Sequence, residues 1–239
     1  MITPDAERTA LRPPGQQLWA QRRRAVVRAG TGVAATGVTL AAGLVATYPR
    51  WRQWCLTWGA EGDEATRALP GDELLPNPAI LSTRAVRVAA PPGAIWPWLV
   101  QMGPGRGGAY TYDWIENLLG LGMHSADRIL PQFQALKIGD AQRLGARGPV
   151  LRVAILDQAR SLVFRSDDGN WIWAFFLAPD DAGARLISRN RIATPIASRL
   201  TRALYTYLME PGSLVMERKM LLGIKERAER LALDSRQPS

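Results

Sequence analysis

The chain has 239 residues, of which 47% are hydrophobic and 21% are charged. Such fractions are typical of globular proteins, and they exclude a wholly disordered chain, a collagen-like chain and a multi-span membrane protein. Lys and Arg number 30 against 21 Asp and Glu, so the formal net charge is +9, which suggests nucleic acid or an acidic membrane as a partner. With one cysteine, Cys55, and one histidine, His124, the chain can form neither an intrachain disulfide nor a zinc site of His and Cys. We expect no metal and no cofactor.

The N-terminal part of the chain predicts attachment to a membrane. Residues 1–24 are polar and basic and predict a flexible tail. Residues 29–48 carry no charged side chain over about the length that a bilayer requires. Arginines crowd the start of this run, at Arg22, Arg23, Arg24 and Arg28. Tryptophans at helical spacing follow it, at Trp51, Trp54 and Trp58, as suits the headgroup layer. We predict a transmembrane anchor or export signal at residues 25–50, single-pass, with the N-terminus in the cytoplasm.

Two alternatives for this segment stay open. The pair Arg23-Arg24 before a weakly apolar stretch resembles a twin-arginine export signal, which would be cleaved. An amphipathic helix whose tryptophans pack on the main domain is the other alternative. Residues 51–80 are then a juxtamembrane helix and an acidic, proline-marked connector, which places Cys55 outside the folded domain. The domain itself is expected at residues 81–232, with a short tail at 233–239.

The first half of this domain predicts one strand and several short helices. Residues 84–88 alternate between polar and apolar side chains as a strand does. A proline pair then opens a helix through residues 95–100. After a Gly-rich loop, short helices are predicted at residues 112–119 and 126–133.

The second half predicts antiparallel strands followed by a long helix. Strand patterns occur at residues 151–155, 162–164, 171–177 and 185–192, and turn residues separate them. The third of these is apolar on both faces. The C-terminal segment is helical, and we expect Pro211-Gly212 to interrupt it, with Ser213 as the N-cap of the following piece. This order predicts an α+β fold in which a curved antiparallel sheet wraps around the terminal helix and leaves room for a cavity.

Several local strings resemble a membrane-tethered bacterial group of the SRPBCC superfamily, over about residues 57–230. They are Trp96-Pro97-Trp98-Leu99-Val100-Gln101-Met102-Gly103, Gly105-Arg106-Gly107-Gly108, Tyr112-Asp113-Trp114-Ile115-Glu116-Asn117, His124-Ser125-Ala126-Asp127-Arg128-Ile129, Glu210-Pro211-Gly212 and Met216-Glu217-Arg218-Lys219-Met220. The resemblance implies the START-like helix-grip fold, related to polyketide cyclases and lipid-transfer domains. It also implies a deep apolar cavity between the sheet and the C-terminal helix.

Two motifs suggest nucleotide binding or hydrolysis, but we interpret both as local structural features. Gly103, Gly105 and Gly108 match G-x-G-x-x-G, but a helix precedes them where a dinucleotide site needs a strand. A loop at the cavity mouth, with Arg106 as an anion contact, is the better interpretation. The group His124, Ser125 and Asp127 has the residue types of a hydrolase triad, yet neighbours in sequence rarely converge. We interpret Ser125 as a helix N-cap and keep His124 as a candidate general acid or base.

The aromatic side chains and a few polar ones predict the ligand site. Aromatic rings with a polar tip suit a pocket that orients an amphiphilic ligand. The predicted ligand-binding residues are Arg106, Tyr110, Tyr112, Trp114, His124, Trp171, Trp173, Arg189 and Glu210. The candidate catalytic residues are His124, Glu116 and Glu210.

Arginines spread over the predicted strands without any nucleic-acid motif, so nucleic acid is not expected as a partner. We expect an anionic membrane surface instead. The leading hypothesis is a membrane-anchored domain that binds a hydrophobic small molecule or lipid. A cyclase- or hydrolase-like enzyme and a non-catalytic structural or interaction module are the alternatives. Catalysis is less favoured than binding without catalysis.

Overall fold

The computed structural model describes residues 48–118, 120–145, 148–193 and 198–235. The chain divides into two compact units, residues 1–51 and residues 52–239. Of the first unit only residues 48–51 are described, and they are helical. The tail and nearly all of the predicted anchor therefore lie outside the described residues. Among the helices that are described, none has the length and apolar character needed to cross a bilayer.

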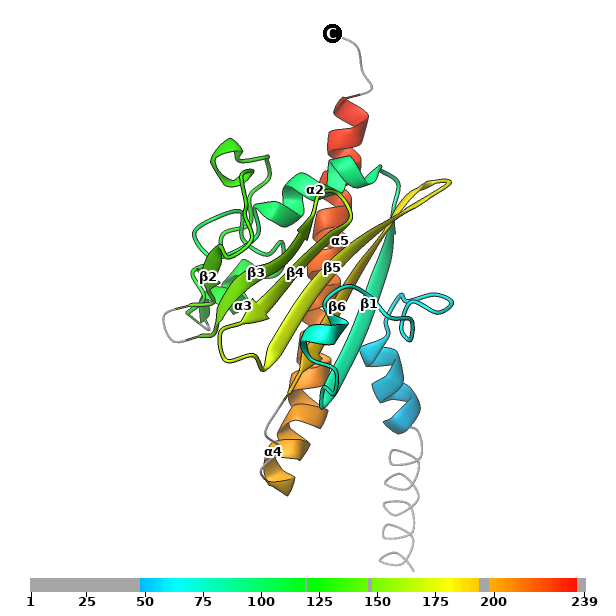
Figure 1. The fold of residues 1–239 in the computed structure, drawn as a ribbon, viewed down its shortest axis with the longest axis vertical. Coiled ribbons are helices and arrows are strands. Elements are labelled where there is room, and N and C mark those ends of the chain that lie inside the picture. Colours follow the sequence, from blue (N-terminus) through cyan, green and yellow to red (C-terminus); the bar gives the residue numbers. More distant parts are fainter. Residues whose placement is uncertain (1–47, 119, 146–147, 194–197, 236–239) are drawn as a thin grey trace, which may run out of the picture. The chain divides into compact units, whose positions relative to one another are not determined.

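The second unit is built on one antiparallel sheet of six strands, in the order β1-β6-β5-β4-β3-β2 (Figure 1). The strands are β1 (Ile80–Val88), β2 (Ala141–Arg143), β3 (Val150–Asp157), β4 (Ser161–Ser166), β5 (Trp171–Asp180) and β6 (Gly183–Ile192). The five predicted strands are confirmed. β2 was not predicted, because three residues are too few to show a periodic pattern. β1 is an edge strand that pairs with β6 along its whole length, which brings Ser82 opposite Asn190.

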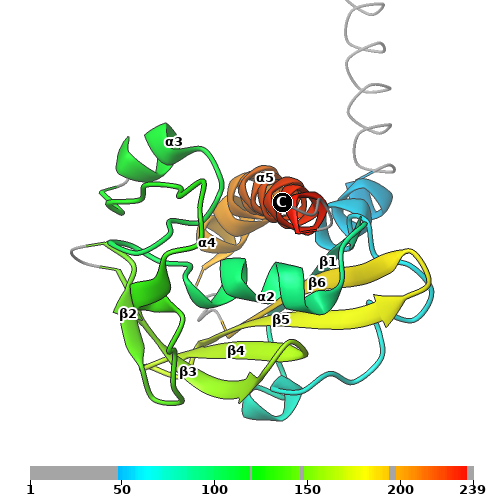
Figure 2. The ribbon, with the colours of Figure 1, turned by 90° about the horizontal axis from the view of Figure 1, so that it is seen from above.

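Helices cover one face of this sheet. They are α2 (Pro92–Val100) and α5 (Glu210–Asp234). The other helical elements are α3 (Asp113–Leu118), α4 (Arg199–Leu204), the short turns η1 (Asp72–Leu74) and η2 (Pro131–Phe133), and the π-helical turn η3 (Tyr205–Met209). Figure 2 shows α5 and α2 on one side of the curved sheet, while the segment before β1 runs along the other side. The predicted α+β architecture, a curved antiparallel sheet gripping a C-terminal helix, is therefore confirmed.

Two hydrophobic cores lie on opposite faces of the sheet. Phe175, Leu177 and Leu186 pack with α2 and α5 on the concave face. Ile172 and Phe176 pack with Leu69, Leu74 and Leu75 on the convex face. Because successive side chains of a strand point to opposite faces, a strand buried on both sides must be apolar at every position. The two cores thus explain why β5 lacks polar alternation.

The acidic segment before β1 packs tightly on the convex face. Arg185 of β6 donates two hydrogen bonds to Glu64, from Nε to Oε1 at 2.9 Å and from Nη2 to Oε2 at 2.7 Å. Asp72 binds Arg189 at 2.6 Å and Arg191 at 3.0 Å. All three arginines are buried. The expectation that the strand arginines face anionic lipid is therefore wrong for these three, because each forms an ion pair with a carboxylate inside the fold.

Cys55 also lies in the packed structure. It is buried, and its carbonyl oxygen accepts a hydrogen bond from Arg84 Nε at 2.9 Å. The prediction that this cysteine lies outside the folded domain is wrong. The helical residues 52–56 instead contact β1 through the hydrogen bond from Arg84 to the Cys55 carbonyl oxygen. The compact unit therefore begins well before residue 81, where the sequence placed the start of the domain.

The Glu64–Arg185 pair predicts a defined pH dependence of stability. Burial by itself raises the pKa of Glu64, but hydrogen bonds from Arg185 and from the Glu61 backbone N–H hold that pKa below its ordinary value. A lowered native pKa means that the pair stabilises the fold above the unfolded-state pKa, about 4.3, and that this contribution is lost as the pH falls through the native pKa. We expect Glu64→Gln to reduce the free energy of unfolding by about 2 kcal/mol at neutral pH, as for a hydrogen bond to a charged group.

Urea unfolding of both proteins at neutral and acidic pH measures this effect. The difference between wild type and Glu64→Gln should shrink as the pH drops below the unfolded-state pKa. Glu61→Gln is the matched control, because the exposed Glu61 carboxylate lies 3.3 Å from Arg185 and should contribute less. A difference that stays constant over this pH range would contradict the assignment.

Three predicted helix features are corrected by the structure. Residues 126–130 are not helical, and of the helix predicted at residues 126–133 only the short turn η2 forms. Ser125 is no N-cap, because its backbone N–H and hydroxyl both donate to the Asp113 carboxylate, at 2.8 and 2.5 Å. Pro211-Gly212 does not break the last helix. The wider turn η3 precedes Pro211 and accommodates its ring and missing N–H, so that Ser213 lies inside α5.

Candidate functional site

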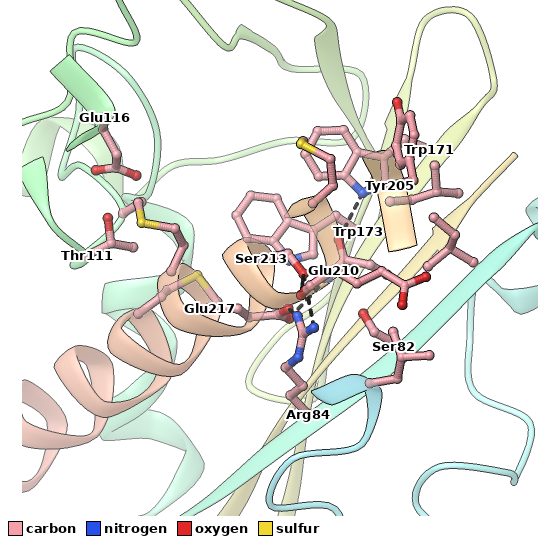
Figure 3. A pocket seen from close by; sticks show the side chains of 18 residues that line it. Ser82, Arg84, Thr111, Glu116, Trp171, Trp173, Tyr205, Glu210, Ser213 and Glu217 are labelled. Atoms are coloured by element: carbon pink, nitrogen blue, oxygen red, sulfur yellow. Dashed lines mark hydrogen bonds and ion pairs between the residues drawn. The ribbon is translucent and has the colours of Figure 1, made fainter. Parts of the chain in front are cut away.

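A cavity of about 320 Å³ lies between the concave face of the sheet and α5 (Figure 3). Its wall is almost wholly apolar. β1, β5 and β6 supply Ile80, Ser82, Arg84, Trp171, Trp173, Asn190 and Ile192. α5 and η3 supply Tyr205, Met209, Glu210, Ser213, Met216, Glu217 and Met220. Leu56, Ala109, Thr111 and Glu116 complete the wall.

Two tryptophans form the sheet side of the cavity. Trp171 and Trp173 lie two residues apart on β5, and their rings stack at 5.8 Å with an interplanar angle of 17°. Their indole N–H groups donate to neighbouring β6 side chains, Trp171 to Asn190 Oδ1 at 2.8 Å and Trp173 to Ser188 Oγ at 3.2 Å. These bonds satisfy the polar atom of each indole, so the apolar ring surface is what the cavity offers to a ligand.

A network of polar side chains, with Arg84 and Glu217 buried at its centre, also belongs to this wall. Arg84 Nη1 donates to Glu217 Oε2, and Arg84 Nη2 donates to Ser213 Oγ at 3.0 Å. The other oxygen of Glu217 accepts from the Ser188 hydroxyl at 2.5 Å and from Asn190 Nδ2 at 3.1 Å. Figure 3 shows Arg84, Ser213 and Glu217 converging between β1 and α5. The charges of Arg84 and Glu217 therefore compensate each other, which a buried ion pair requires.

A second ion pair joins Glu210, at the start of α5, to the helical residues 52–56. Arg52 donates from Nε to Glu210 Oε2 at 2.7 Å and from Nη2 to Oε1 at 2.6 Å. Glu210 is buried, whereas the Arg52 side chain is 36% exposed. This paired geometry fixes the carboxylate, so Glu210 is held by the protein and not free to act on a ligand.

Glu116 differs from the other carboxylates of the cavity. It is only 5% exposed, yet its Oε2 atom has no hydrogen-bond partner among the described residues, and the same is true of Thr111 Oγ1. The two side chains lie together in Figure 3, away from the Arg84 network. Burial raises the pKa of Glu116, the Thr111 hydroxyl opposes the rise, and the negative charge of Asp113 adds to it.

The structure places only some of the predicted site residues at the cavity. Trp171, Trp173, Glu116 and Glu210 line it. Tyr110 lies in the core instead, where its hydroxyl donates to the Trp98 carbonyl oxygen at 2.9 Å, and burial raises its pKa.

The remaining predicted residues lie elsewhere. Arg106 donates to the carbonyl oxygens of Val100 and Phe133, so that it braces its own loop. Trp114 is exposed, and the Tyr112 ring faces the Lys219 ammonium at 5.9 Å. Arg189 points to the convex face and binds Asp72.

The geometry does not favour His124 as a catalytic group. Its side chain is 96% exposed, and its nearest ionic partner is Asp113 at 3.9 Å. It does not line the cavity. Asp127, the third residue of the supposed triad, binds Arg227 at 2.6 Å. Within the described ranges no group of three or more His, Cys, Asp or Glu side chains is arranged to hold a metal ion.

Sequence reasoning did not single out the polar network of the cavity wall. Arg84, Ser213 and Glu217 come from elements more than a hundred residues apart. Alternation along β1 and β6 would have placed Arg84 and Asn190 on the concave faces of their strands, since each shares a face with buried apolar neighbours. A polar residue on a buried face is the signal that could have found them.

The comparisons with known proteins concern the fold. No family model and no curated protein matches the sequence. Among solved structures, a protein from Mesorhizobium loti is 16% identical with a TM-score of 0.38, over 66% of this chain and 100% of that chain. A polyketide-cyclase-like protein from Corynebacterium glutamicum is 14% identical with a TM-score of 0.32, over 65% and 91% of the two chains. An AHSA1-like protein from Aeromonas hydrophila is 14% identical with a TM-score of 0.38, over 67% and 99%.

The element order, the sheet and the C-terminal helix described above are those of the helix-grip fold.

Proposed function

We propose that this domain binds a hydrophobic small molecule or lipid in the cavity beneath α5, and that residues 25–50 hold the chain at a membrane with the N-terminus in the cytoplasm. The observation that carries the first part is the cavity itself. Its volume of about 320 Å³ lies within the range of small-molecule sites, which are concave, mostly apolar and fitted with a few polar groups. The uncharged run at residues 29–48 and the arginines before it support the second part.

The contacts of the cavity's polar groups favour binding over catalysis. A catalytic acid, base or nucleophile must be able to reach the reacting atoms. Arg84 and Glu217 are committed to each other, and Glu210 is committed to Arg52. Apart from Glu116 and Thr111, what the wall presents to a ligand is therefore chiefly the rings of Trp171 and Trp173 and the side chains of the methionines.

The direct test is to isolate the full chain from its own membranes and record native mass spectra after gentle release. We expect a fraction of the protein to carry one apolar small molecule that organic extraction removes. Protein that carries none, and that also takes up no added apolar compound, would refute the proposed function. Partition of the full chain with membranes after an alkaline carbonate wash tests the anchor separately, and recovery in the supernatant would refute that part.

A further inference from the structure

The cavity contains one polar position that the protein itself leaves unsatisfied. Glu116 Oε2 and Thr111 Oγ1 both line the cavity, both are buried, and neither has a hydrogen-bond partner within the described part of the chain. A buried polar atom without a partner costs about 1–3 kcal/mol, so native proteins rarely keep one without a reason. A ligand that supplies the missing partner provides that reason.

The other polar groups of the wall show that this position is unusual. Glu217 accepts from Arg84, Ser188 and Asn190, and Glu210 accepts twice from Arg52. Among the described residues, Glu116 forms no ion pair with any Lys, Arg or His. The charged side chain that affects its pKa is Asp113, which is negative as well. The cavity therefore has one carboxyl group whose counterpart must come from the bound molecule.

We infer that the ligand is an apolar molecule that carries a hydrogen-bond donor, a hydroxyl or an amine, which binds Glu116 and Thr111 while its apolar body lies against Trp171 and Trp173. This inference rests on the proposed function and names its ligand class. A carboxylic acid is the disfavoured ligand, because its carboxylate would bring a second negative charge or a competing acceptor to Glu116. The two side chains also have different requirements: Glu116 needs a donor, whereas the Thr111 hydroxyl can itself donate to a ligand oxygen.

The experiment is a competition between probes that share one apolar chain. The tagged full-length protein is incubated with an equimolar mixture of decanol, decylamine and decanoate and captured, and the retained molecules are quantified by mass spectrometry. We expect wild type to retain decanol and decylamine about tenfold over decanoate, as one hydrogen bond to a charged group is worth roughly that factor. Comparing the same probe ratio between wild type and variants cancels the different partition of each probe into detergent or lipid.

Variants separate the contributions of the two side chains. In Glu116→Gln, which keeps the shape of the side chain, the preference for decylamine should fall about tenfold and decanoate should gain. In Thr111→Val, decanol retention should fall while decylamine retention stays, because an ammonium has no acceptor for the Thr111 hydroxyl. Glu226→Gln is the control, since it removes one negative charge from an exposed position of α5.

The outcomes distinguish the inference from the function on which it rests. Selective retention that Glu116→Gln abolishes and Glu226→Gln preserves supports the inference. Retention of all three probes in equal amounts, or a preference for decanoate that Glu116→Gln leaves unchanged, overturns the inference but keeps the proposed function. Failure of the wild type to retain any probe overturns both. Thermal unfolding of each variant confirms that the compared proteins are folded.

Discussion

Replacement of Arg84 by methionine is expected to lower the free energy of unfolding by about 3–5 kcal/mol, because it leaves the buried Glu217 carboxylate without its counter-charge. The side chains of Arg84 and Glu217 are only 1% and 8% exposed, so water cannot take over the missing interaction. The substitution also removes the donors to the Cys55 carbonyl and the Ser213 hydroxyl. Chemical denaturation monitored by circular dichroism measures the loss.

Two further variants give this prediction its controls. Arg87→Met changes the same residue type on the same strand, but the Arg87 side chain is 52% exposed, and its pairs with Glu61 and Asp180 are expected to contribute about 0–1 kcal/mol. The double variant Arg84→Met with Glu217→Met should recover much of the stability, since removing both charges leaves none uncompensated. If Arg84→Met unfolds within 1 kcal/mol of wild type, the network is not what stabilises the junction of β1 and α5.

Replacement of Met216 by tryptophan is expected to weaken the binding of apolar ligands at least tenfold while the fold persists. Met216 lines the cavity from α5, and a rigid indole would take up part of the 320 Å³ that a ligand needs. A flexible thioether chain adapts to a bound molecule, whereas an indole ring does not. The capture experiment with decanol reports the retained amount, and thermal unfolding reports the integrity of the fold.

Val215→Trp is the matched control, because Val215 adjoins Met216 on α5 but is 52% exposed and does not line the cavity. It should bind decanol as the wild type does. Equal retention by Met216→Trp and Val215→Trp would show that the ligand does not occupy the cavity beneath α5. The proposed function would then have to be abandoned for this site.

The regular elements of the domain were predictable because they depend on neighbours in sequence. Alternation located four strands to within a few residues, and a continuous apolar run located β5, whose two faces pack in separate cores. The cavity between sheet and helix was also predictable, since a curved sheet and one helix cannot fill the space between them completely. Trp171 and Trp173 followed from their spacing of two on an apolar strand.

Local motifs were less dependable where chemistry had to be assigned. His124, Ser125 and Asp127 form a suggestive group in sequence, but they do not converge on one another: His124 and Ser125 lie beside Asp113, whereas Asp127 binds Arg227. Glu116 was named as one carboxylate among several. Its special position follows only from the absence of partners among the described residues around it, which no sequence pattern records.

The sequence by itself thus determined which segments become strands and helices, because side-chain periodicity acts over a few residues. Only the tertiary structure decided which charges meet. It brought Glu64 and Asp72 of the acidic segment to the arginines of β6, and Arg84 of β1 to Glu217 of α5. The physical reason is that a buried charge must find a partner wherever the fold brings one close, and here those partners stand more than a hundred residues apart.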